Sequence, residues 1–499
     1  MLKNLLFIEL LIVVGSVIFY MASTRATRRD VGHLPGIVLG VMAAIGYLAP
    51  TLIIAHIAIG LVPIIFGRTK LKVGMIVAMG VFALPTLQID LRLGSMWLFL
   101  WSIQSSLAVG GLIAFLIAPG RAAKAPPWAD VTMFMVIAVL IVIDAREGAW
   151  IGYLRQVAMY LFVYVIPVYL VTRSARNAVE WRTLLTAMAG LGIILAVIVL
   201  YEARSTWPLY ASMVPRYGID VDVFVKWRGG MMRAYGPMSE ATNMGFVLVI
   251  CFAAALAVRR SFVSNLAYIG VVLLVAIGTL APQSRGGMIG IAVAFVVSSF
   301  YRRGIAGIGQ LSLTGLFLSG AYATATMIGS INDQISTSLN EATGSGDYRT
   351  ELLRRGMQEF WKSPLFGEDF TVVMGRMQDM VQGEGIVDFV NTYLYFAVFS
   401  GAIGLAIYCI AFIIPIGRLF QIRRLLPSAS AERELAGFSL ALLVSAAVML
   451  TFTSFLPRPT IFLLIASSIA MMIRVPAREI STNKKIDLRF RPTNDPIAA

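Results

Sequence analysis

Long apolar runs alternate along this chain with short polar segments that are rich in charges and turn residues. A helix that spans a membrane needs about 20 mostly apolar residues, and about fifteen runs approach that length. The pattern therefore predicts an all-α, polytopic transmembrane helical bundle of about 12–15 spans. The runs lie near residues 3–22, 34–49, 51–66, 73–89, 97–118, 129–144, 156–172, 183–201, 239–258, 264–281, 287–301, 305–329, 390–417, 435–455 and 459–473.

Two parts of this pattern have more than one interpretation. Residues 34–49 and 51–66 are short runs that meet at Pro50, so a tight helical hairpin and a single broken helix both fit. The first run resembles a signal peptide, but a basic segment at 24–29 follows it where a small-residue cleavage site would stand. We therefore expect a retained first span.

Basic residues are unevenly divided between the loops. If the N-terminus lies outside, every second loop is rich in Lys and Arg, and these loops together with the tail hold 25 of the 41 basic residues. Because cytoplasmic loops carry such an excess, we expect these loops and the C-terminus to face the cytoplasm. Two longer segments, 203–238 and 330–389, then lie outside.

The expected organisation follows from these assignments. The second outer loop contains apolar residues near helical spacing at 350–362, as in an amphipathic helix at the membrane interface. The expected parts are transmembrane helices at 1–202, an outer loop at 203–238, helices at 239–329, a large outer loop at 330–389, helices at 390–473 and a basic cytoplasmic tail at 474–499.

The composition agrees with a membrane protein and excludes several classes of function and of metal site. The chain is 58% hydrophobic and 13% charged, which excludes an ordinary soluble domain. The net charge of +15 reflects loop topology, and we expect no nucleic-acid binding because no basic groove with interleaved aromatics is present. Cys251 and Cys409 both fall in apolar runs, so no disulfide framework or cysteine-rich metal site is available.

Four short polar motifs fall on the predicted outer side. Three of them carry an arginine, and guanidinium groups bind phosphate oxygens in a bidentate manner while staying charged. Arg233, Arg285 and Arg349 are therefore candidates to converge on one anion. Arg285 also fits an interfacial snorkelling residue, and Arg233 and Arg349 also fit solvated loop residues. The motifs are residues 233–240 (RAYGPMSE), 283–287 (QSRGG), 347–349 (DYR) and 388–391 (DFVN).

Carboxylates near the same span ends are candidate general bases. A hydroxyl group becomes a good nucleophile when a positioned carboxylate takes its proton. Asp388 and Glu240 each stand just before a span and are the best placed, followed by Glu384 and Asp347. Asp388 also fits a helix N-cap. Arg354, Arg355, Lys362 and Arg376 are interpreted as solvated charges or headgroup contacts.

The two histidines do not suit a catalytic role on the outer side. His33 lies in a predicted cytoplasmic loop, and His56 stands alone inside a span, where a packed and hydrogen-bonded role is typical. The sequence has no zinc-site pattern, P-loop or serine–histidine–acid arrangement. We expect no tightly bound metal, but the carboxylates within 330–389 leave a weaker cation site as an alternative.

Several motifs in order resemble the bacterial O-antigen ligase and polymerase superfamily. These are the loop arginine Arg233, the Ser-Arg-Gly-Gly turn at 284–287, an Arg-led helix ending in Lys-Ser-Pro-Leu-Phe-Gly at 362–367, and Asn-Thr-Tyr-Leu at 391–394 followed by Gly-Ala-Ile-Gly-Leu at 401–405. The resemblance covers about residues 230–420, and the flanking spans match only in hydropathy.

The resemblance implies a GT-C-like, cofactor-free and metal-independent inverting glycosyltransferase of the bacterial inner membrane, active at the periplasmic face. Its donor and acceptor would be glycans linked to undecaprenyl diphosphate, and the enzyme would lie in the lipid bilayer. A chain-length-regulating or export complex would be a further partner. Arg233, Arg285, Arg349, Asn391 and Tyr393 would bind the donor diphosphate. Asp388 or Glu240 would act as base, and Arg285 would stabilise the leaving group.

One departure favours a branch of the superfamily. Ligases carry a His-Asn pair at the start of the span after the long loop, whereas this chain has Val390-Asn391. We therefore favour polymerisation of oligosaccharide repeat units, as in O-antigen or exopolysaccharide synthesis. The alternatives are a ligase-type transfer to another acceptor, a transporter for lipid-linked sugars, and a non-catalytic export subunit.

Overall fold

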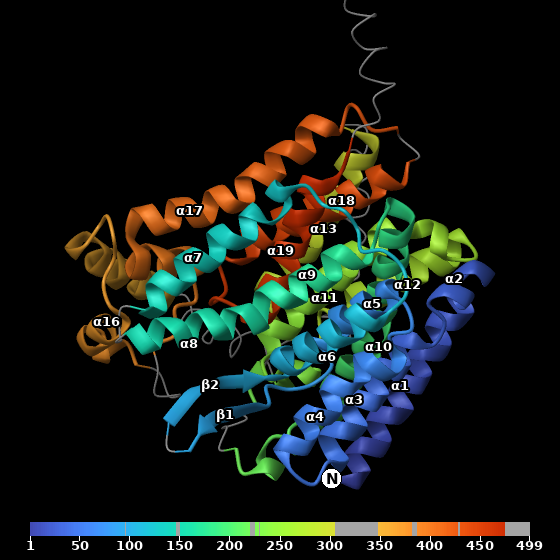
Figure 1. The fold of residues 1–499 in the computed structure, drawn as a ribbon, viewed down its shortest axis with the longest axis horizontal. Coiled ribbons are helices and arrows are strands. Elements are labelled where there is room, and N and C mark those ends of the chain that lie inside the picture. Colours follow the sequence, from blue (N-terminus) through green and yellow to red (C-terminus); the bar gives the residue numbers. More distant parts are fainter. Residues whose placement is uncertain are drawn as a thin grey trace, which may run out of the picture.

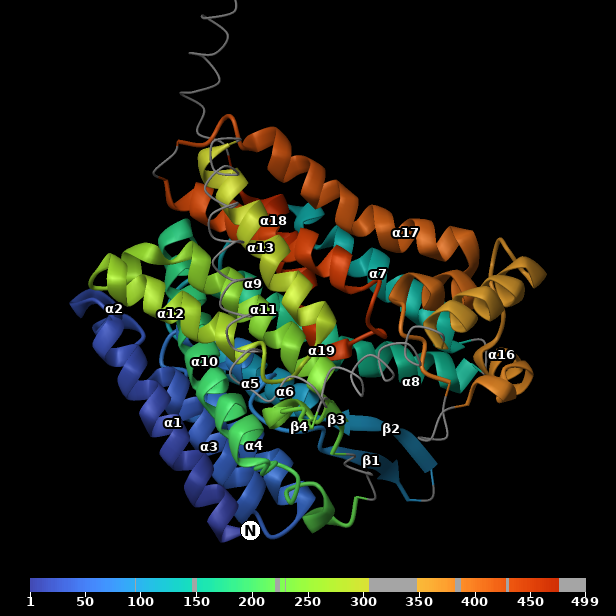
Figure 2. The ribbon, with the colours of Figure 1, turned by 180° about the vertical axis from the view of Figure 1, so that it is seen from behind.

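The computed structural model describes residues 1–94, 96–145, 150–219, 225–228, 230–304, 348–381, 387–427 and 430–474. These residues are mostly helical and form a bundle (Figures 1 and 2). Six helical segments are long and apolar enough to cross a membrane: Leu2–Ala22, Arg25–Leu48, Pro127–Asp144, Trp150–Ser174, Ala178–Ser205 and Thr392–Ile422. They mark the chain as a helical membrane protein. The predicted span at 305–329, residues 330–347 and the tail from 475 lie outside the described residues.

The first half of the chain contributes ten helices and one hairpin to the described structure. The run at 34–66 forms two helices, α3 and α4, separated by residues 49–51, rather than one broken helix. The elements are α1 Leu2–Ala22, α2 Arg25–Asp30, α3 Leu34–Leu48, α4 Leu52–Phe66, α5 Lys70–Gly80, β1 Gln88–Leu93, β2 Met96–Ser102, α6 Ile103–Ile117, α7 Val131–Ala145, α8 Trp150–Tyr160, α9 Ile166–Ser174 and α10 Ala178–Ser205.

The second half supplies the remaining helices and a second, very short hairpin. Residues 348–362 are also helical, in agreement with the helix predicted at 350–362. The other elements are β3 Trp227–Arg228, β4 Met231–Met232, α11 Ala241–Ala257, α12 Asn265–Gly278, α13 Arg285–Arg303, α16 Phe370–Arg376, α17 Thr392–Ile422, α18 Ala431–Met449 and α19 Pro457–Met472.

Helices α10 and α11 form the centre of the bundle. Nearly every residue of α11 is buried, and α10 packs against α1, α11 and α12. Small residues allow close contact here, because a Cβ added at Gly192 of α10 would lie 2.5 Å from the Cβ of Cys251 in α11. The bundle is therefore held by close packing of apolar faces.

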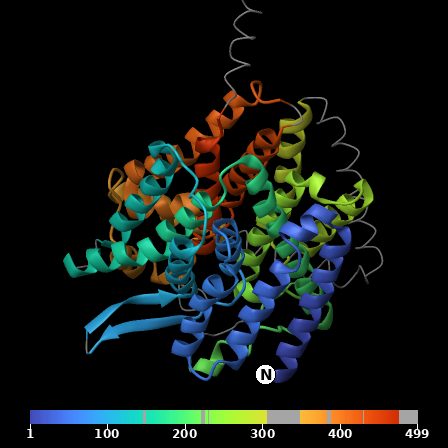
Figure 3. The same cartoon turned by 45° about the vertical axis from the view of Figure 1, so that its right-hand side comes forward.

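The facing ends of two predicted spans and the residues between them form a β-hairpin instead, preceded by irregular chain at 81–87. The runs at 73–89 and 97–118 were expected to be helical throughout, but α5 ends at Gly80 and β1 pairs antiparallel with β2. Pro85 disfavours helix at the preceding residue, Gly94 supplies a positive φ of 61° at the turn, and aromatic residues favour strands. Hydropathy alone does not separate these cases. Figure 3 shows the hairpin extending from the bundle.

A break divides α17, and a loop from the segment predicted to lie outside packs into it. Gly401 has φ 67° and ψ −172°, which interrupts the helix. The amide of Ala402 donates to the carbonyl of Pro364 at 2.8 Å, and the amide of Glu368 donates to Val398 at 2.9 Å. The two motifs at 362–367 and 401–405 therefore dock on each other.

The loops predicted to share the cytoplasmic side lie together at one end of the bundle. Glu434, at the start of α18, pairs with Arg182 at 2.7 Å and with Arg260 at 3.4 Å. Arg423 donates to the carbonyls of Phe300 and Tyr301 near the end of α13. Cations at helix C-termini satisfy carbonyls that lack helical partners and oppose the helix dipole.

Candidate functional site

The turn between α12 and α13 is held by two arginines of the loop at 203–238. Nη1 of Arg228 donates to the carbonyl of Gln283 at 2.8 Å, and Nε of Arg233 donates to that of Pro282 at 3.2 Å. The amide of Ala234 donates to the carbonyl of Ala281 at 3.2 Å. These bonds fix the turn that precedes Arg285.

Arg285 is the first residue of α13, and its side chain is exposed. Oγ of Ser284 accepts from the amide of Gly287 at 3.2 Å and thereby caps the helix. A Cβ at Gly287 would lie 3.2 Å from Cα of Gly245 in α11, so the glycine permits the close backbone approach that the sequence suggests. The N-terminus of a long helix carries partial positive charge, which adds to the guanidinium as an attraction for anions.

Arg349 lies close enough to both Arg285 and Asp388 for its charge to interact with theirs. Burial and the charge of Arg285 lower the pKa of Arg349, while the carboxylate of Asp388 opposes that shift. The hydroxyl of Tyr348 donates to the carbonyl oxygen of Asp388 at 3.3 Å. The hydroxyl of Ser454 donates to Oδ1 of Asp388 and fixes the carboxylate. Segments far apart in sequence are thus brought together.

A second charge group surrounds Arg233. Burial and the charge of Arg228 lower the pKa of Arg233 to about 10, and Glu240 opposes the shift. This value leaves Arg233 charged at neutral pH. Glu240 is exposed, stands just before α11, and accepts from Nδ2 of Asn243 at 3.4 Å. The charges of Arg233 and Glu240 therefore attract each other near the turn that precedes Arg285.

Arg458 joins this group, although the sequence reasoning did not select it. Its side chain is buried at the start of α19, where Nη1 donates to the carbonyl of Leu84 at 2.6 Å and Nη2 to Oγ1 of Thr86 at 3.1 Å. Glu240 also interacts with the Arg458 charge. The sequence feature that could have identified Arg458 is the Pro-Arg-Pro at 457–459, where the last predicted span begins.

Glu202 is a second residue that the sequence reasoning missed. It is fully buried near the end of α10, where Oε1 accepts from the amide of Leu209 at 2.9 Å and Oε2 from that of Gly236 at 2.8 Å. The carboxylate therefore closes the loop that carries Arg228 and Arg233. The sequence feature that could have identified Glu202 is an acidic residue directly after an apolar span.

Asn391 and Tyr393 make contacts within the protein. Oδ1 of Asn391 accepts from the amides of Tyr393 and Leu394 at 3.0 and 3.2 Å, so Asn391 is the N-cap of α17. The capping role considered for Asp388 belongs to Asn391. The hydroxyl of Tyr393 donates to the carbonyl of Ala447 at 2.8 Å and ties α17 to α18. Both side chains position the start of α17 next to Asp388.

The four cations of residues 354–376 that were interpreted as surface charges are paired with carboxylates. Arg354 pairs with Glu351, Arg355 with Asp379, and Lys362 with Glu359. Arg376 pairs with Glu359 at 3.2 Å and with Glu368 at 3.4 Å. These contacts agree with the interpretation of the four cations as surface charges and join residues 348–362 to α16. Asp347 and Glu384 lie outside the described residues.

Comparisons with known proteins identify no relative of this chain. No family model matches the chain, and no curated protein matches its sequence. Within the described ranges, no group of three or more His, Cys, Asp or Glu side chains is placed to hold a metal ion. The described residues instead form two charge groups, one of Arg285, Arg349 and Asp388 and one around Arg233 and Glu240, and the turn at 281–283 joins them. Guanidinium groups can bind an anion, and a carboxylate can accept a proton.

Proposed function

We propose that this chain is a GT-C-like membrane glycosyltransferase that polymerises polyprenyl-diphosphate-linked oligosaccharide repeat units at the periplasmic face of a bacterial inner membrane. The observation that carries the proposal is that the charge of Arg349 interacts with those of Arg285 and Asp388, which come from two other segments, while Tyr348 bonds to the carbonyl of Asp388. The order of motifs between residues 230 and 420, with its resemblance to the O-antigen polymerase branch, supplies the reaction class.

The arginines suit a diphosphate because their like charges are held together. Arg285 disfavours the charge of Arg349, and Arg228 disfavours the charge of Arg233. A bound anion relieves that repulsion and accepts charge-assisted hydrogen bonds. Arg285 is exposed and therefore accessible to a lipid-linked donor. In the transition state, the same guanidinium groups stabilise the charge that grows on the leaving diphosphate.

Asp388 is the better placed of the two candidate bases. Its carboxylate is half-buried, oriented by Ser454, and close to the charge of Arg349. It takes the proton of the acceptor hydroxyl while that oxygen bonds to the anomeric carbon of the donor. The bond from that carbon to the diphosphate oxygen breaks, and the lipid diphosphate leaves. Glu240 interacts with Arg233 and Arg458 and balances their charge.

The test replaces Arg285 with Ala and Asp388 with Asn in cells that make the glycan. Removing either a charge that acts in the transition state or a general base typically lowers the rate by about 10²-fold or more. We expect lipid-linked single repeats to accumulate and polymer to disappear. Arg354→Ala is the matched control, because Arg354 is an exposed outer arginine paired with Glu351. Unchanged polymer from correctly inserted R285A and D388N proteins refutes the proposal.

A further inference from the structure

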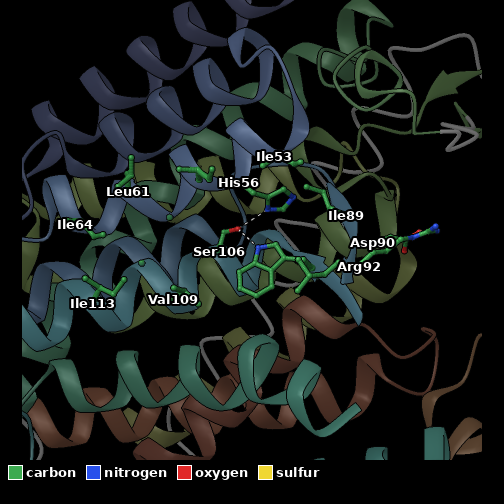
Figure 4. Close-up of a pocket in the computed structure, with 15 residues that line it drawn as sticks. Ile53, His56, Leu61, Ile64, Ile89, Asp90, Arg92, Ser106, Val109 and Ile113 are labelled. Carbon is green, nitrogen blue, oxygen red and sulfur yellow. Dashed lines mark hydrogen bonds and ion pairs between the residues drawn. The ribbon is translucent and has the colours of Figure 1, made fainter. Parts of the chain in front are cut away.

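A groove of about 690 Å³ lies between α4, α6 and the β1–β2 hairpin (Figure 4), and none of Arg233, Arg285 and Arg349 lines it. Its size falls within the range of small-molecule sites. Ile57 and Leu61 in its wall are exposed, as are Ile54 and Leu116 beside it, so the groove opens on an apolar surface that would face the bilayer. The lining residues are Ile53, His56, Ile57, Gly60, Leu61, Ile64, Ile89, Asp90, Leu91, Arg92, Trp101, Ser106, Val109, Gly110 and Ile113.

His56 supplies an unused hydrogen-bonding group in this groove. Its Nδ1 lies 2.8 Å from Oγ of Ser106, and Nε1 of Trp101 donates to the same oxygen at 2.8 Å. The Ser106 hydroxyl is then free to donate its proton to Nδ1, which leaves the ring proton on Nε2. His56 is 5% exposed, and Nε2 has no partner among the described residues. A buried donor without a partner is unfavourable, so the groove favours a ligand that carries an acceptor.

The outer rim of the groove carries one charge of each sign. Arg92 and Asp90 belong to β1, and their side chains pair at 3.2 Å while remaining exposed. Nε1 of Trp97 also donates to Oδ1 of Asp90 at 3.2 Å. In Figure 4 the His56 ring lies on the same side of the groove as Ile89, Asp90 and Arg92. A ligand with neighbouring positive and negative groups is complementary to this rim.

The rest of the groove suits a hydrocarbon chain. It continues from His56 to Ile64, eight residues along α4, which is about 12 Å of helical rise. Val109 and Ile113 of α6 face the same space. Its floor is narrow because Gly60 and Gly110 let the helices approach closely: a Cβ at Gly110 would lie 1.7 Å from the Gly60 carbonyl oxygen.

We propose that this groove binds a zwitterionic aminophospholipid, of the phosphatidylethanolamine type, from the outer leaflet. Its ammonium group pairs with Asp90 and its phosphate with Arg92. Nε2 of His56 donates to an ester carbonyl oxygen, and one acyl chain lies along Ile57, Leu61 and Ile113. This site does not depend on the proposed glycosyltransferase activity.

The test measures lipid binding to the purified full chain in detergent by native mass spectrometry. The probes are phosphatidylethanolamine, phosphatidylcholine and phosphatidylglycerol with identical acyl chains. We expect phosphatidylethanolamine to bind most tightly. Loss of one hydrogen bond is worth roughly 1 kcal/mol, so His56→Leu should weaken its binding about fivefold. His56→Gln retains an amide donor and should restore most of the affinity.

A second pair of variants keeps the test informative if H56L does not fold. Ile113→Trp fills the groove from α6, whereas Leu116→Trp places the same side chain on the exposed face of that helix outside the lining. We expect I113W to lose the bound lipid and L116W to retain it. Asp90→Asn should remove the preference for phosphatidylethanolamine over phosphatidylcholine. Equal binding of all three lipids, or unchanged binding in I113W, overturns the proposal.

Discussion

Glu202 shows how one buried side chain organises the loop at 203–238. Both carboxylate oxygens accept backbone amides, one from Leu209 and one from Gly236, on either side of the segment that carries Arg228. Buried carboxylates of this kind are stable because amide donors replace water. Glu202 therefore acts on the arginine group through the backbone and is a positioning residue.

Replacing Glu202 with Gln should destabilise this loop. A glutamine keeps one acceptor oxygen but directs its NH₂ group at the second backbone amide, which leaves a buried donor unpaired. We expect a loss of roughly 1–3 kcal/mol. The measurement is thermal unfolding of the purified protein followed by tryptophan fluorescence. Glu180→Gln is the control on the same helix, since Glu180 pairs with the exposed Arg176. Equal stability of both variants contradicts this role.

At this scale, sequence reasoning was better at finding exposed groups than buried ones. Arg285 and Asp388 were predicted because each interrupts an apolar pattern at a span end, and in the structure the charge of each interacts with that of Arg349. Arg458 and Glu202 were missed because their partners are backbone groups 374 and up to 34 residues away in the chain. Hydrogen bonds between residues so far apart in the chain produce no local sequence pattern, so they could not be predicted.

The break in α17 is the clearest case at the scale of elements. Gly401 adopts a backbone conformation that is essentially restricted to glycine, and a Cβ there would lie 2.3 Å from the carbonyl of Leu365. The outer segment therefore docks on α17 only because this residue has no side chain.

Gly401→Ala should disrupt this contact. Backbone strain alone costs roughly 1–3 kcal/mol, and the clash with Leu365 adds to it. We expect faster hydrogen exchange at the amides of Glu368 and Ala402, which bond across the contact. Gly417→Ala tests the same helix where an added Cβ meets nothing within 4 Å. If G401A exchanges as slowly as G417A, the break does not hold the loop.

Hydropathy predicted a helix correctly only where the length of the apolar run and the spacing of its apolar residues both fitted a helix. The helix at 348–362 was predicted from its local pattern. For residues 34–66 the sequence left a hairpin and a single broken helix open, and the structure shows two helices on either side of Pro50. The hairpin at 88–102 was not predicted, because Trp97, Phe99 and Trp101 are as apolar as helix residues and also favour strands. The amphipathic stripe was also only partly right: Leu352 is buried, but Leu353 is exposed.

The predicted orientation of the whole molecule is testable by cysteine labelling. In a C251A/C409A background, Thr350→Cys should react with a membrane-impermeant maleimide in right-side-out vesicles. Val263→Cys, in a loop predicted to be cytoplasmic, should react only after the membrane is opened. Both positions are exposed in the structure, so access depends on the side of the membrane. Labelling of V263C from outside would reverse the assignment.

The short helices around the hairpin have a consequence for the surrounding lipid. α4 and α6 contain 15 residues each and rise only about 22 Å, whereas the hydrocarbon core of a bilayer is about 30 Å thick. Their apolar faces are exposed, so the adjoining leaflets must thin to match them. We expect the membrane to be locally compressed beside these helices, which would bring the headgroups of neighbouring lipids closer to its midplane.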